Sequence, residues 1–210
     1  SSDFYEYKIT NSLRLNGTDQ ALEKTWGQAA TTNDKFAISV WVKRTGGTGT
    51  NSAIGSTTNT KIWSASSGNG NASDQLEFNT GNPSGYSDHL GYSFNGGAAW
   101  GLKRYRDPSA WYQVVMIYDS TQSTATSRIR MFINGDQEPL SSDTGYWNIN
   151  TAAQVNQNTD SSVGQNGHQL HIGRYVYDDA GWWGGQMADF ICIDGAAAIS
   201  DFGETKNGVW

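Results

Sequence analysis

Cysteine, proline and long apolar runs are scarce in this chain of 210 residues. The one cysteine, Cys192, cannot form an internal disulfide, and its place in the short apolar segment Phe190–Ile193 favours a small buried side chain over a reactive thiol. No apolar run approaches the ~20 residues of a membrane helix. The sequence therefore excludes a disulfide framework and predicts no membrane insertion.

Charge is also scarce, at 16% of residues, and it is biased toward acids. The formal net charge of −6 argues against a nucleic-acid partner, because binding to phosphates depends on clustered Lys and Arg. Neutral polar groups must then cover most of the surface. The chain opens with Ser1-Ser2-Asp3, without methionine or a signal-peptide pattern, so we expect a processed chain or a module of a larger protein.

Glycine and aromatic residues are abundant instead. Twenty-five glycines, three prolines and 12% aromatics are typical of short strands joined by many turns, and 210 residues suit one all-β domain. No window keeps the apolar spacing of a core-facing helix. The sequence predicts one domain over residues 1–210, in which residues 1–10 form an arm or edge strand.

Two neighbouring segments give the clearest strand patterns. In 111–119 the alternate residues Tyr112 and Val114 face one way and Val115 the other, which is typical of a strand within a two-layer β structure. In 128–134 the apolar residues alternate before Asn134-Gly135, the pair that a type I′ hairpin turn requires. Further strands are expected at 12–16, 36–43, 52–55, 61–65, 75–79, 89–95, 169–176 and 186–193.

These segments resemble the concanavalin A-like jelly rolls of the laminin-G and pentraxin type. The resemblance rests on the Trp-Tyr-x-x-Val strand at 111, on Phe132-x-Asn-Gly, on Trp41-Val42-Lys43, on Ile172-Gly173-Arg174 and on the closing segment 185–190. It implies an antiparallel sandwich of two sheets.

A narrower likeness covers the tail, in Ile193-Asp194-Gly195, Phe202-Gly203-Glu204 and Asn207-Gly208-Val209-Trp210, together with 106–112. These motifs resemble structural proteins of tailed bacteriophages and marine viruses. The likeness implies a place on the virion surface, in a tail fibre or as a capsid decoration, after assembly in the host cytoplasm. Other virion proteins and further copies of the chain are the expected partners.

Catalytic patterns are weak. The Glu-x-Asp-x-x-Glu strand of glycosidases with this fold has no match, and the nearest acids are Asp74 with Glu77, on opposite faces of a strand, and Asp136 with Glu138 after a turn. We interpret both pairs as solvated turn charges. Gln169-Leu170-His171 has the Gln-x-His spacing of polysaccharide lyases, with Arg174 and Tyr175 following, but without the lyases' second motif. The sequence therefore predicts no enzyme, and a depolymerase stays an alternative.

Metal patterns are equally weak. His168 and His171 lack a third His or Cys ligand nearby. Calcium prefers carboxylate and carbonyl oxygens, and the resemblance implies such a site at one rim of the sandwich. The adjacent pair Asp178-Asp179 is the best candidate, followed by Asn69, Asn71 and Asp74.

Tryptophan supports binding rather than catalysis. Sugars stack on aromatic rings, and nine tryptophans exceed the need of one core. Strand positions assign Trp41, Trp111, Trp183 and Trp210 to the core, and leave Trp63, Trp100, Trp147 and Trp182 in or beside loops. We therefore predict a carbohydrate-binding rim that is composed of Trp100, Arg104, Tyr105, Trp147 and Trp182.

The resulting hypothesis is a lectin-like domain that binds host-surface polysaccharide without cleaving it. A purely structural virion module is the alternative within the same class, and in that case the remaining tryptophans cover the sandwich ends or meet a neighbouring subunit.

Overall fold

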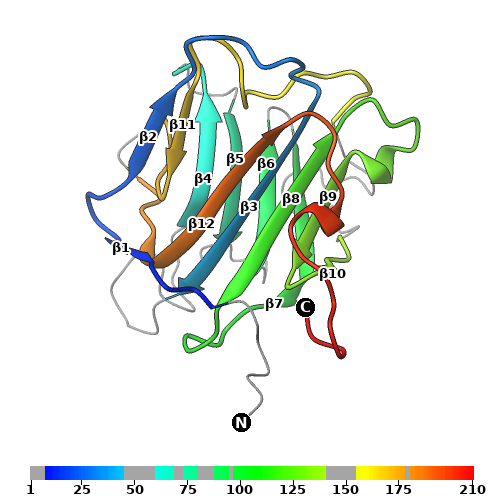
Figure 1. Ribbon diagram of the computed structural model, residues 1–210. Coiled ribbons are helices and arrows are strands. Elements are labelled where there is room, and N and C mark those ends of the chain that lie inside the picture. The colour runs from blue at the N-terminus through cyan, green and yellow to red at the C-terminus, as the bar shows by residue number, and fades with distance from the viewer. Residues whose placement is uncertain are drawn as a thin grey trace.

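The computed structural model is a sandwich of two antiparallel sheets (Figure 1). It describes residues 8–44, 60–68, 73–79, 88–94, 97–140, 155–177 and 180–210. Within these residues each sheet has six strands, and the only helices are two 3₁₀ turns, η1 (Ala125–Ser127) and η2 (Ile199–Asp201). The predicted all-β fold is therefore confirmed.

Sheet A has the order β1-β12-β3-β8-β9-β10, and sheet B has the order β2-β11-β4-β5-β6-β7. The strands of sheet A are β1 (Leu13–Asn16), β12 (Gly184–Asp194), β3 (Lys35–Arg44), β8 (Tyr112–Asp119), β9 (Ile129–Ile133) and β10 (Asp136–Gln137). Those of sheet B are β2 (Leu22–Thr25), β11 (Gln169–Ile172), β4 (Thr60–Ser66), β5 (Ser73–Asn79), β6 (His89–Phe94) and β7 (Gly97–Arg104).

The core lies between the sheets and follows the predicted alternation. Tyr112, Val114, Met116 and Tyr118 of β8 face it, as do Ile129, Met131 and Ile133 of β9. The β9–β10 turn is Asn134-Gly135, whose φ angles of 51° and 81° are the positive values that a type I′ turn requires. Local pattern and turn chemistry therefore determine this hairpin.

The outer face of sheet A carries a second, smaller apolar cluster. Val115, Ile117, Ala37 and Phe132 are buried there, beside Ile193 of β12 and against Ala197, Ile199 and Phe202 of the C-terminal segment. Figure 1 shows this segment crossing in front of sheet A. The tail motifs that resemble virion proteins therefore have a structural role, because Phe202 belongs to this cover. Trp210 lies beside it, against Gly135 and Gly203.

Several tryptophans differ from their predicted places. Trp183 is fully buried, as expected, but so is Trp63, which lies in β4 within the predicted strand 61–65 and faces the core instead of a loop. Trp41 pairs with Gln113 and Ala188 on the outer face of sheet A and is half-buried. Trp111 precedes β8, and Trp210 packs outside sheet A, so neither belongs to the core between the sheets.

The strand predictions were otherwise close. The segment 52–55 lies outside the described residues, and β2 and β7 were not predicted. β10 was expected only as the second arm of the Asn134-Gly135 hairpin, without bounds. The expected strand 169–176 ends at Ile172, because Gly173 has a φ of +88° that strands do not adopt. Cys192 is exposed on β12, so its expected burial was wrong.

Candidate functional site

β7 determines where two of the predicted site residues lie. Trp100 is a strand residue rather than a loop residue, since β7 pairs with β6 from Phe94↔Gly97 to His89↔Arg104. Its ring lies against Gly91, where an added Cβ would meet Cζ3 of Trp100 at 1.9 Å. The side chain is 4% exposed. Trp100 therefore offers no free ring face for a sugar, which corrects the prediction for this residue.

Arg104 is held by a buried histidine, His89, on the face of sheet B that also carries the contact between Gly91 and Trp100. Gly91 pairs with Trp100 and His89 with Arg104, and residues 89 and 91 share one face of β6. The Nε of Arg104 donates to Nε2 of His89 at 3.0 Å, and Nδ1 of His89 lies 2.7 Å from the carbonyl oxygen of Gly101. Because Nε2 accepts, Nδ1 carries the hydrogen, so the imidazole is locked in one tautomer. Arg104 itself is exposed.

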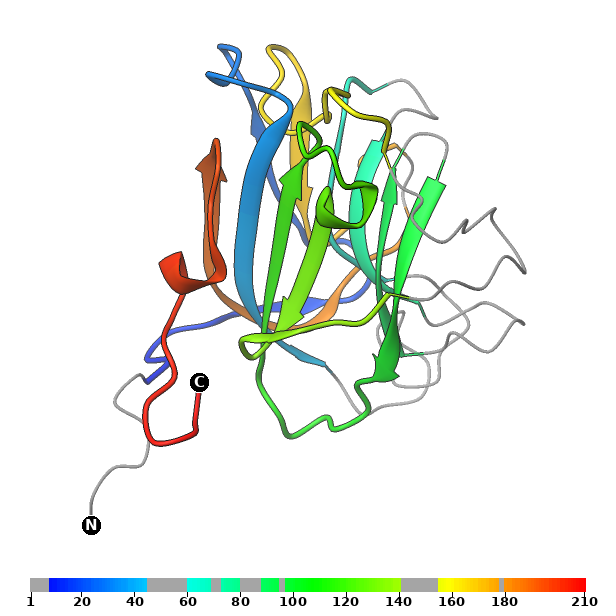
Figure 2. The ribbon, with the colours of Figure 1, turned by 90° about the vertical axis from the view of Figure 1, so that its right-hand side faces the viewer.

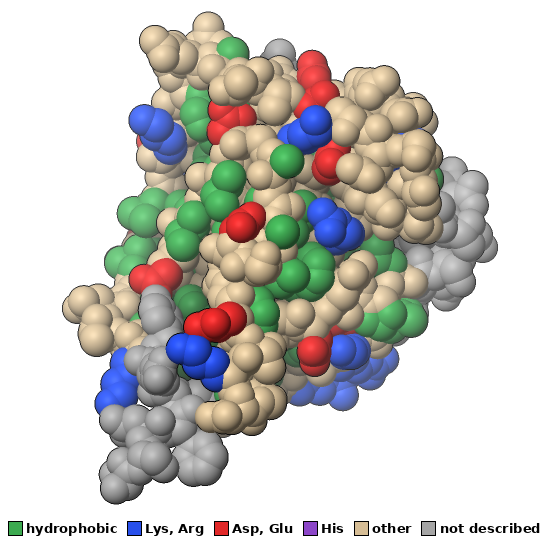
Figure 3. Space-filling model, turned by 45° about the vertical axis from the view of Figure 1, so that its right-hand side comes forward, with side chains coloured by type: hydrophobic (Ala, Val, Ile, Leu, Met, Phe, Trp, Pro, Cys, Tyr) green, Lys and Arg blue, Asp and Glu red, His purple; other side chains and the backbone are tan. Residues whose placement is uncertain are grey.

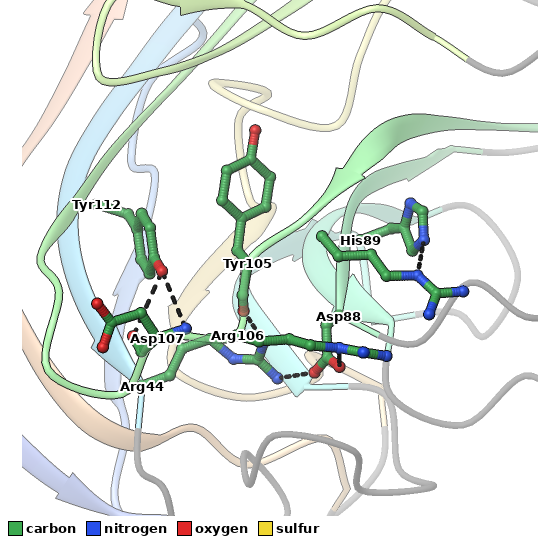
Figure 4. Close-up of polar contacts among 8 residues, drawn as sticks. Arg44, Asp88, His89, Tyr105, Arg106, Asp107 and Tyr112 are labelled. Carbon is green, nitrogen blue, oxygen red and sulfur yellow. Dashed lines mark hydrogen bonds and ion pairs between the residues drawn. The ribbon is translucent and has the colours of Figure 1, made fainter.

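A second exposed arginine is held by a buried aspartate. The Nε of Arg106 donates to Oδ2 of Asp88 at 2.8 Å, and the side chain of Arg106 remains 51% exposed. Oδ1 of Asp88 lies 2.9 Å from Nη2 of Arg44. Figure 4 shows the Asp88 carboxylate between the two guanidinium groups. Asp88 is fully buried and has a φ of +69°, a left-handed backbone conformation immediately before β6.

Arg44, unlike Arg104 and Arg106, is buried. It donates from Nη1 to the carbonyl oxygen of Tyr105 at 2.6 Å, and its guanidinium lies 4.8 Å from the ring centre of Phe78. Burial lowers the pKa of Arg44, and the adjacent Asp88 carboxylate opposes this shift. The Arg44–Asp88 pair therefore ties the end of β3 to the start of β6 and to the segment after β7.

Tyr105 faces away from these charges (Figure 4). Its ring packs against Phe78 and Tyr112, and its hydroxyl donates to Oε2 of Glu138. Burial and this hydrogen bond raise the pKa of Tyr105. Glu138 also accepts from the backbone N–H of Lys103 at 2.8 Å and is 1% exposed, so it is not the solvated turn charge that we expected.

Lys103, Arg104 and Arg106 together form what we call the basic rim. All three side chains are exposed. Lys and Arg side chains gather along the lower edge of the molecule in Figure 3, the edge at which β7 ends in Figure 2. In a chain with a net charge of −6 the basic rim is a local positive surface that a carboxylate or sulfate could approach.

A different group of side chains gathers near β4 and β11. The guanidinium of Arg174 lies 5.2 Å from a ring centre of Trp182, and Nζ of Lys61 lies 5.4 Å from that of Tyr175. Trp182 is 6% exposed, whereas Tyr177 is 54% exposed and packs edge-on against Tyr175. We call residues 174–177 the tyrosine turn. Tyr177 was not among the predicted site residues, although it follows the end of β11, where exposed binding residues often lie.

The predicted five-residue site therefore divides. Arg104 belongs to the basic rim, Trp100 is buried beside it, and Tyr105 faces the core. Trp182 lies near β4, three strands from β7 and so about 15 Å away across the sheet. Trp147 lies outside the described residues.

Asp74 and Glu77 lie on opposite faces of β5, as predicted, but both are buried rather than solvated. Asp74 faces the core, where it accepts from the hydroxyl of Tyr92 at 2.6 Å and from the backbone N–H of Ser162. Burial raises the pKa of Asp74. Glu77 forms an ion pair with Lys61 on the outer face of sheet B and accepts from Ser93. Each carboxylate is therefore engaged within the fold.

The lyase-like residues do come together. The Nε of Arg174 donates to Nδ1 of His171 at 2.8 Å, and Gln169 shares the outer face of β11 with His171. Burial and the charge of Arg174 lower the pKa of His171. Because Nδ1 accepts from Arg174, the neutral ring carries its hydrogen on Nε2, which is buried. In this state the imidazole presents no free lone pair for use as a base.

Metal ligands are not grouped in the described part of the chain, where no three His, Cys, Asp or Glu side chains cluster. Asp178 and Asp179 lie outside the described residues, as do Asn69 and Asn71. The calcium prediction for Asp178 and Asp179 therefore stays a prediction. Nδ1 of His168 lies 3.3 Å from the carbonyl oxygen of Ser162.

Comparisons with known proteins give structural matches. No protein-family model and no curated protein matches the sequence. Among solved structures, the heptameric SAP-like pentraxin of Limulus polyphemus is 13% identical with a TM-score of 0.54, over 90% of this chain and 77% of that chain. The CBM40 domain of the Ruminococcus gnavus IT-sialidase, solved with α2,3-sialyllactose, is 10% identical with a TM-score of 0.51, over 87% and 94%. The fold is a concanavalin A-like jelly roll.

The mouse laminin α1 domains LG4–5 match this jelly roll too, with 11% identity, a TM-score of 0.54 and coverage of 91% of this chain and 44% of that chain. The predicted laminin-G and pentraxin type of architecture is thereby confirmed. In the described residues of the jelly roll, no helix has the length and apolarity needed to cross a bilayer.

Proposed function

We propose that this jelly roll is a non-enzymatic, lectin-like domain that binds acidic host-surface polysaccharide through the basic rim. We propose further that it acts on the surface of a virion, as part of a tail fibre or as a capsid decoration, among other virion proteins and further copies of itself. The virion role is supported by the motifs of the C-terminal segment and of residues 106–112.

The observation that carries the proposal is the way in which Arg104 and Arg106 are held. Each uses its Nε to donate to a buried acceptor, His89 for Arg104 and Asp88 for Arg106. Both side chains nevertheless remain at the surface. A guanidinium that is fixed in this way loses less freedom when it binds an anion than an unrestrained surface arginine does. Its planar fork also suits the two oxygens of a carboxylate or sulfate.

The affinity of one such rim is expected to be low. Exposed ion pairs contribute about 1 kcal/mol or less each, so three basic side chains give weak binding at a single domain. Many copies on a particle would convert weak contacts into avidity without any further contact. The complex of the CBM40 domain with sialyllactose, an acidic sugar, shows that a neighbour with this fold binds a ligand of that class.

Binding to acidic and neutral polysaccharides tests the proposal. We expect the domain, displayed on multivalent beads, to retain a uronate- or sulfate-bearing polysaccharide and not a neutral glucan. Arg104→Ala/Arg106→Ala should abolish retention, whereas Arg14→Ala/Lys24→Ala, which removes two exposed charges elsewhere, should not. Equal loss in both variants would mean non-specific charge attraction and would overturn the assignment.

The tyrosine turn is an alternative glycan-binding surface for the same proposed function. Among the large apolar side chains of the described residues, Tyr177 is the most exposed, at 54%, and Arg174 is three residues before it in the chain. If Tyr177→Ala removed binding while the double arginine variant kept it, the ligand would stack at the tyrosine turn and not at the basic rim. If the unsubstituted domain itself retained no polysaccharide, the purely structural module would be favoured.

A polysaccharide lyase is the second candidate, and the contact between His171 and Arg174 is the observation that favours it. Incubation with acidic polysaccharide should release no unsaturated uronate if the domain only binds. Release that His171→Gln abolished would establish the depolymerase instead. The locked tautomer of His171 argues for the first outcome.

A further inference from the structure

His89 holds Arg104 without neutralising it. Nε2 of the imidazole accepts from Nε of Arg104 at 3.0 Å, and the dashed line at His89 in Figure 4 marks this bond. Arg106, the other fixed arginine of the basic rim, is held by the carboxylate of Asp88, which also pairs with Arg44. A carboxylate fixes a guanidinium and offsets its charge, whereas a neutral imidazole fixes it and leaves the whole charge for a ligand. Of the two arginines, Arg104 therefore keeps the larger share of its charge for an anion.

The fold leaves His89 little freedom to change this contact. β6 pairs with β5 at Asn79↔His89 and with β7 at His89↔Arg104, and His89 is buried. Nδ1 lies 2.7 Å from the carbonyl oxygen of Gly101, so the hydrogen of the neutral ring is used there and Nε2 is the acceptor. Turning the ring over would give up the bond to Gly101. The orientation of Arg104 therefore depends on the lone pair of Nε2.

Protonation of His89 would turn this attraction into repulsion. The second proton of an imidazolium must sit on Nε2, which then can no longer accept from Arg104. Two N–H groups and two positive charges would face each other across the 3.0 Å of the present bond, so Arg104 would have to leave. Histidine is the side chain whose charge ordinarily changes between about pH 5 and 8. The contact is therefore of a kind that mild acid can break.

The charged groups around His89 lie on β4 to β7 and in the segments beside them. Arg104 is in contact with the ring, and Lys103 precedes it on β7. Among the described residues, the carboxylates near this contact already have partners. These are Glu77, opposite Gly91, with Lys61; Asp88 with Arg44 and Arg106; and Glu138, against Gly101, with Tyr105 and the backbone N–H of Lys103. The bond to Arg104 is therefore the one that a proton on Nε2 displaces.

We propose that His89 is the positioning residue of the basic rim: neutral His89 holds Arg104 ready for an anionic sugar, and protonated His89 releases it. The domain then binds acidic polysaccharide in neutral surroundings and lets it go in acid. This inference rests on the proposed binding of glycan at the basic rim. Simple charge attraction has the opposite sign, because protons gained by any histidine or carboxylate make the domain more positive. A loss of binding in acid therefore separates positioning from attraction.

The ratio of retention between the unsubstituted domain and His89→Gln isolates this effect. Glutamine keeps an acceptor for Arg104 and a donor for Gly101, and it does not titrate. Dextran sulfate is the probe, on beads that carry many copies of the domain, because its ester sulfates keep their charge throughout. We expect similar retention of the probe by both proteins at about pH 8. The ratio should fall about fivefold once His89 has gained its second proton.

His168→Gln is the matched control for the other effects of acid. His168 contacts the carbonyl oxygen of Ser162 and does not belong to the basic rim. This variant should therefore show the same decrease in retention as the unsubstituted domain. A ratio between the unsubstituted domain and His89→Gln that stayed constant or rose through the protonation of His89 would overturn the proposal.

A double-mutant cycle distinguishes positioning of Arg104 from support of the fold. His89→Leu removes the acceptor and should lower retention about fivefold at neutral pH. In the Arg104→Ala background, which keeps Arg106, the same change should have no further effect, because no guanidinium is left to position. Equal losses in both backgrounds would mean that His89 only supports the fold, against the proposal. Urea denaturation of each variant confirms that the proteins compared are folded.

Nitrogen NMR of the side chains tests the inference without any glycan. We expect the Nδ1–H tautomer of His89 in neutral solution. The Nε–H signal of Arg104, identified by its absence in Arg104→Ala, should disappear as His89 gains its second proton. If the unsubstituted domain retained no dextran sulfate at any pH, the proposed function would fail, while these signals would still decide the positioning. An Arg104 signal that survived the protonation, or a His89 that stayed neutral until the protein unfolded, would refute the inference.

Discussion

The indole Nε1 of Trp210 donates a hydrogen bond to Oε1 of Gln113, a β8 residue on the outer face of sheet A. The amide of Gln113 in turn donates to the carbonyl oxygen of Phe202 at 3.0 Å. One glutamine therefore fastens the C-terminal segment at two points. The same ring lies against Gly135, where an added Cβ would meet Cδ2 of Trp210 at 2.3 Å.

Loss of the Trp210 ring should therefore loosen the cover of sheet A. We expect Trp210→Ala to lower the free energy of unfolding by about 2–3 kcal/mol, measured by urea denaturation, and Trp210→Phe by about 1 kcal/mol, since it loses mainly the hydrogen bond. Gly135→Ala should also destabilise, by the clash and by its φ of +81°. The two alanine changes should cost less together than their sum, because they disrupt one contact. Full additivity would contradict the contact.

The hairpin of β9 and β10 shows what the sequence could predict. The alternation in β8 and β9 and the Asn134-Gly135 pair are patterns that span only a few residues. The local sequence was therefore enough to predict these strands and their turn. β7 was not predicted because Gly97-Ala98-Ala99 has no β-branched or alternating apolar pattern. Its place in the sheet depends on its pairing with β6, which the local sequence of β7 does not show. Trp41 and Trp210 were misplaced because the outer face of sheet A is also apolar, and strand position alone does not distinguish the two faces.

The candidate site was harder to predict for a related reason. Exposure depends on partners that are distant in the chain, as Gly91 is for Trp100 and Asp88 for Arg106. The composition could suggest that aromatic and basic residues gather near residues 100–106. It could not show that the tryptophan is buried and that the arginines, held by His89 and Asp88, remain at the surface.

Asp88→Asn should be among the most destabilising single changes. It leaves the buried Arg44 without its counter-charge, and breaking a buried pair from one side costs about 3–5 kcal/mol. Asparagine tolerates a positive φ, so the backbone at this position is not an added cause. Thermal or urea unfolding measures the effect, and Asp136→Asn, at an exposed acid, should stay within about 0.5 kcal/mol. Equal effects would show that Arg44 does not depend on Asp88.

Gly91→Ala should displace the Trp100 ring. The added methyl group would lie 1.9–2.7 Å from three atoms of the indole, so the ring must leave its place or β6 must shift. We expect a loss of about 1–3 kcal/mol and a red shift of tryptophan emission as the ring becomes exposed. Gly91→Ala/Trp100→Ala should recover the part of the loss that the clash causes. If the double variant lost as much stability as the two single variants together, the added methyl group would not clash with the Trp100 ring.

His171 should make stability depend on pH in one direction. Its folded-state pKa lies below the ordinary value of 6.5, first because of burial and then because of Arg174, so the unfolded chain binds the proton more readily. The contribution of neutral His171 to the free energy of unfolding is therefore fully present above pH 6.5. It is lost as the pH falls through the interval between the pKa of the unfolded chain and that of the folded chain. Each unit of pKa lowering corresponds to about 1.4 kcal/mol lost at low pH.

His171→Gln removes this titration and keeps an acceptor for Arg174. We expect the stability difference between the unsubstituted protein and this variant to shrink as the pH falls below 6.5. Urea denaturation at a series of pH values measures that difference. Any contribution of His89 or His168 cancels in it, because both proteins contain these residues. A difference that grew toward low pH would mean that His171 is charged in the fold. Its contact with Arg174 would then have to break, and the exposed Glu23, whose Oε2 lies 3.7 Å from Nε2 of His171, would become its partner.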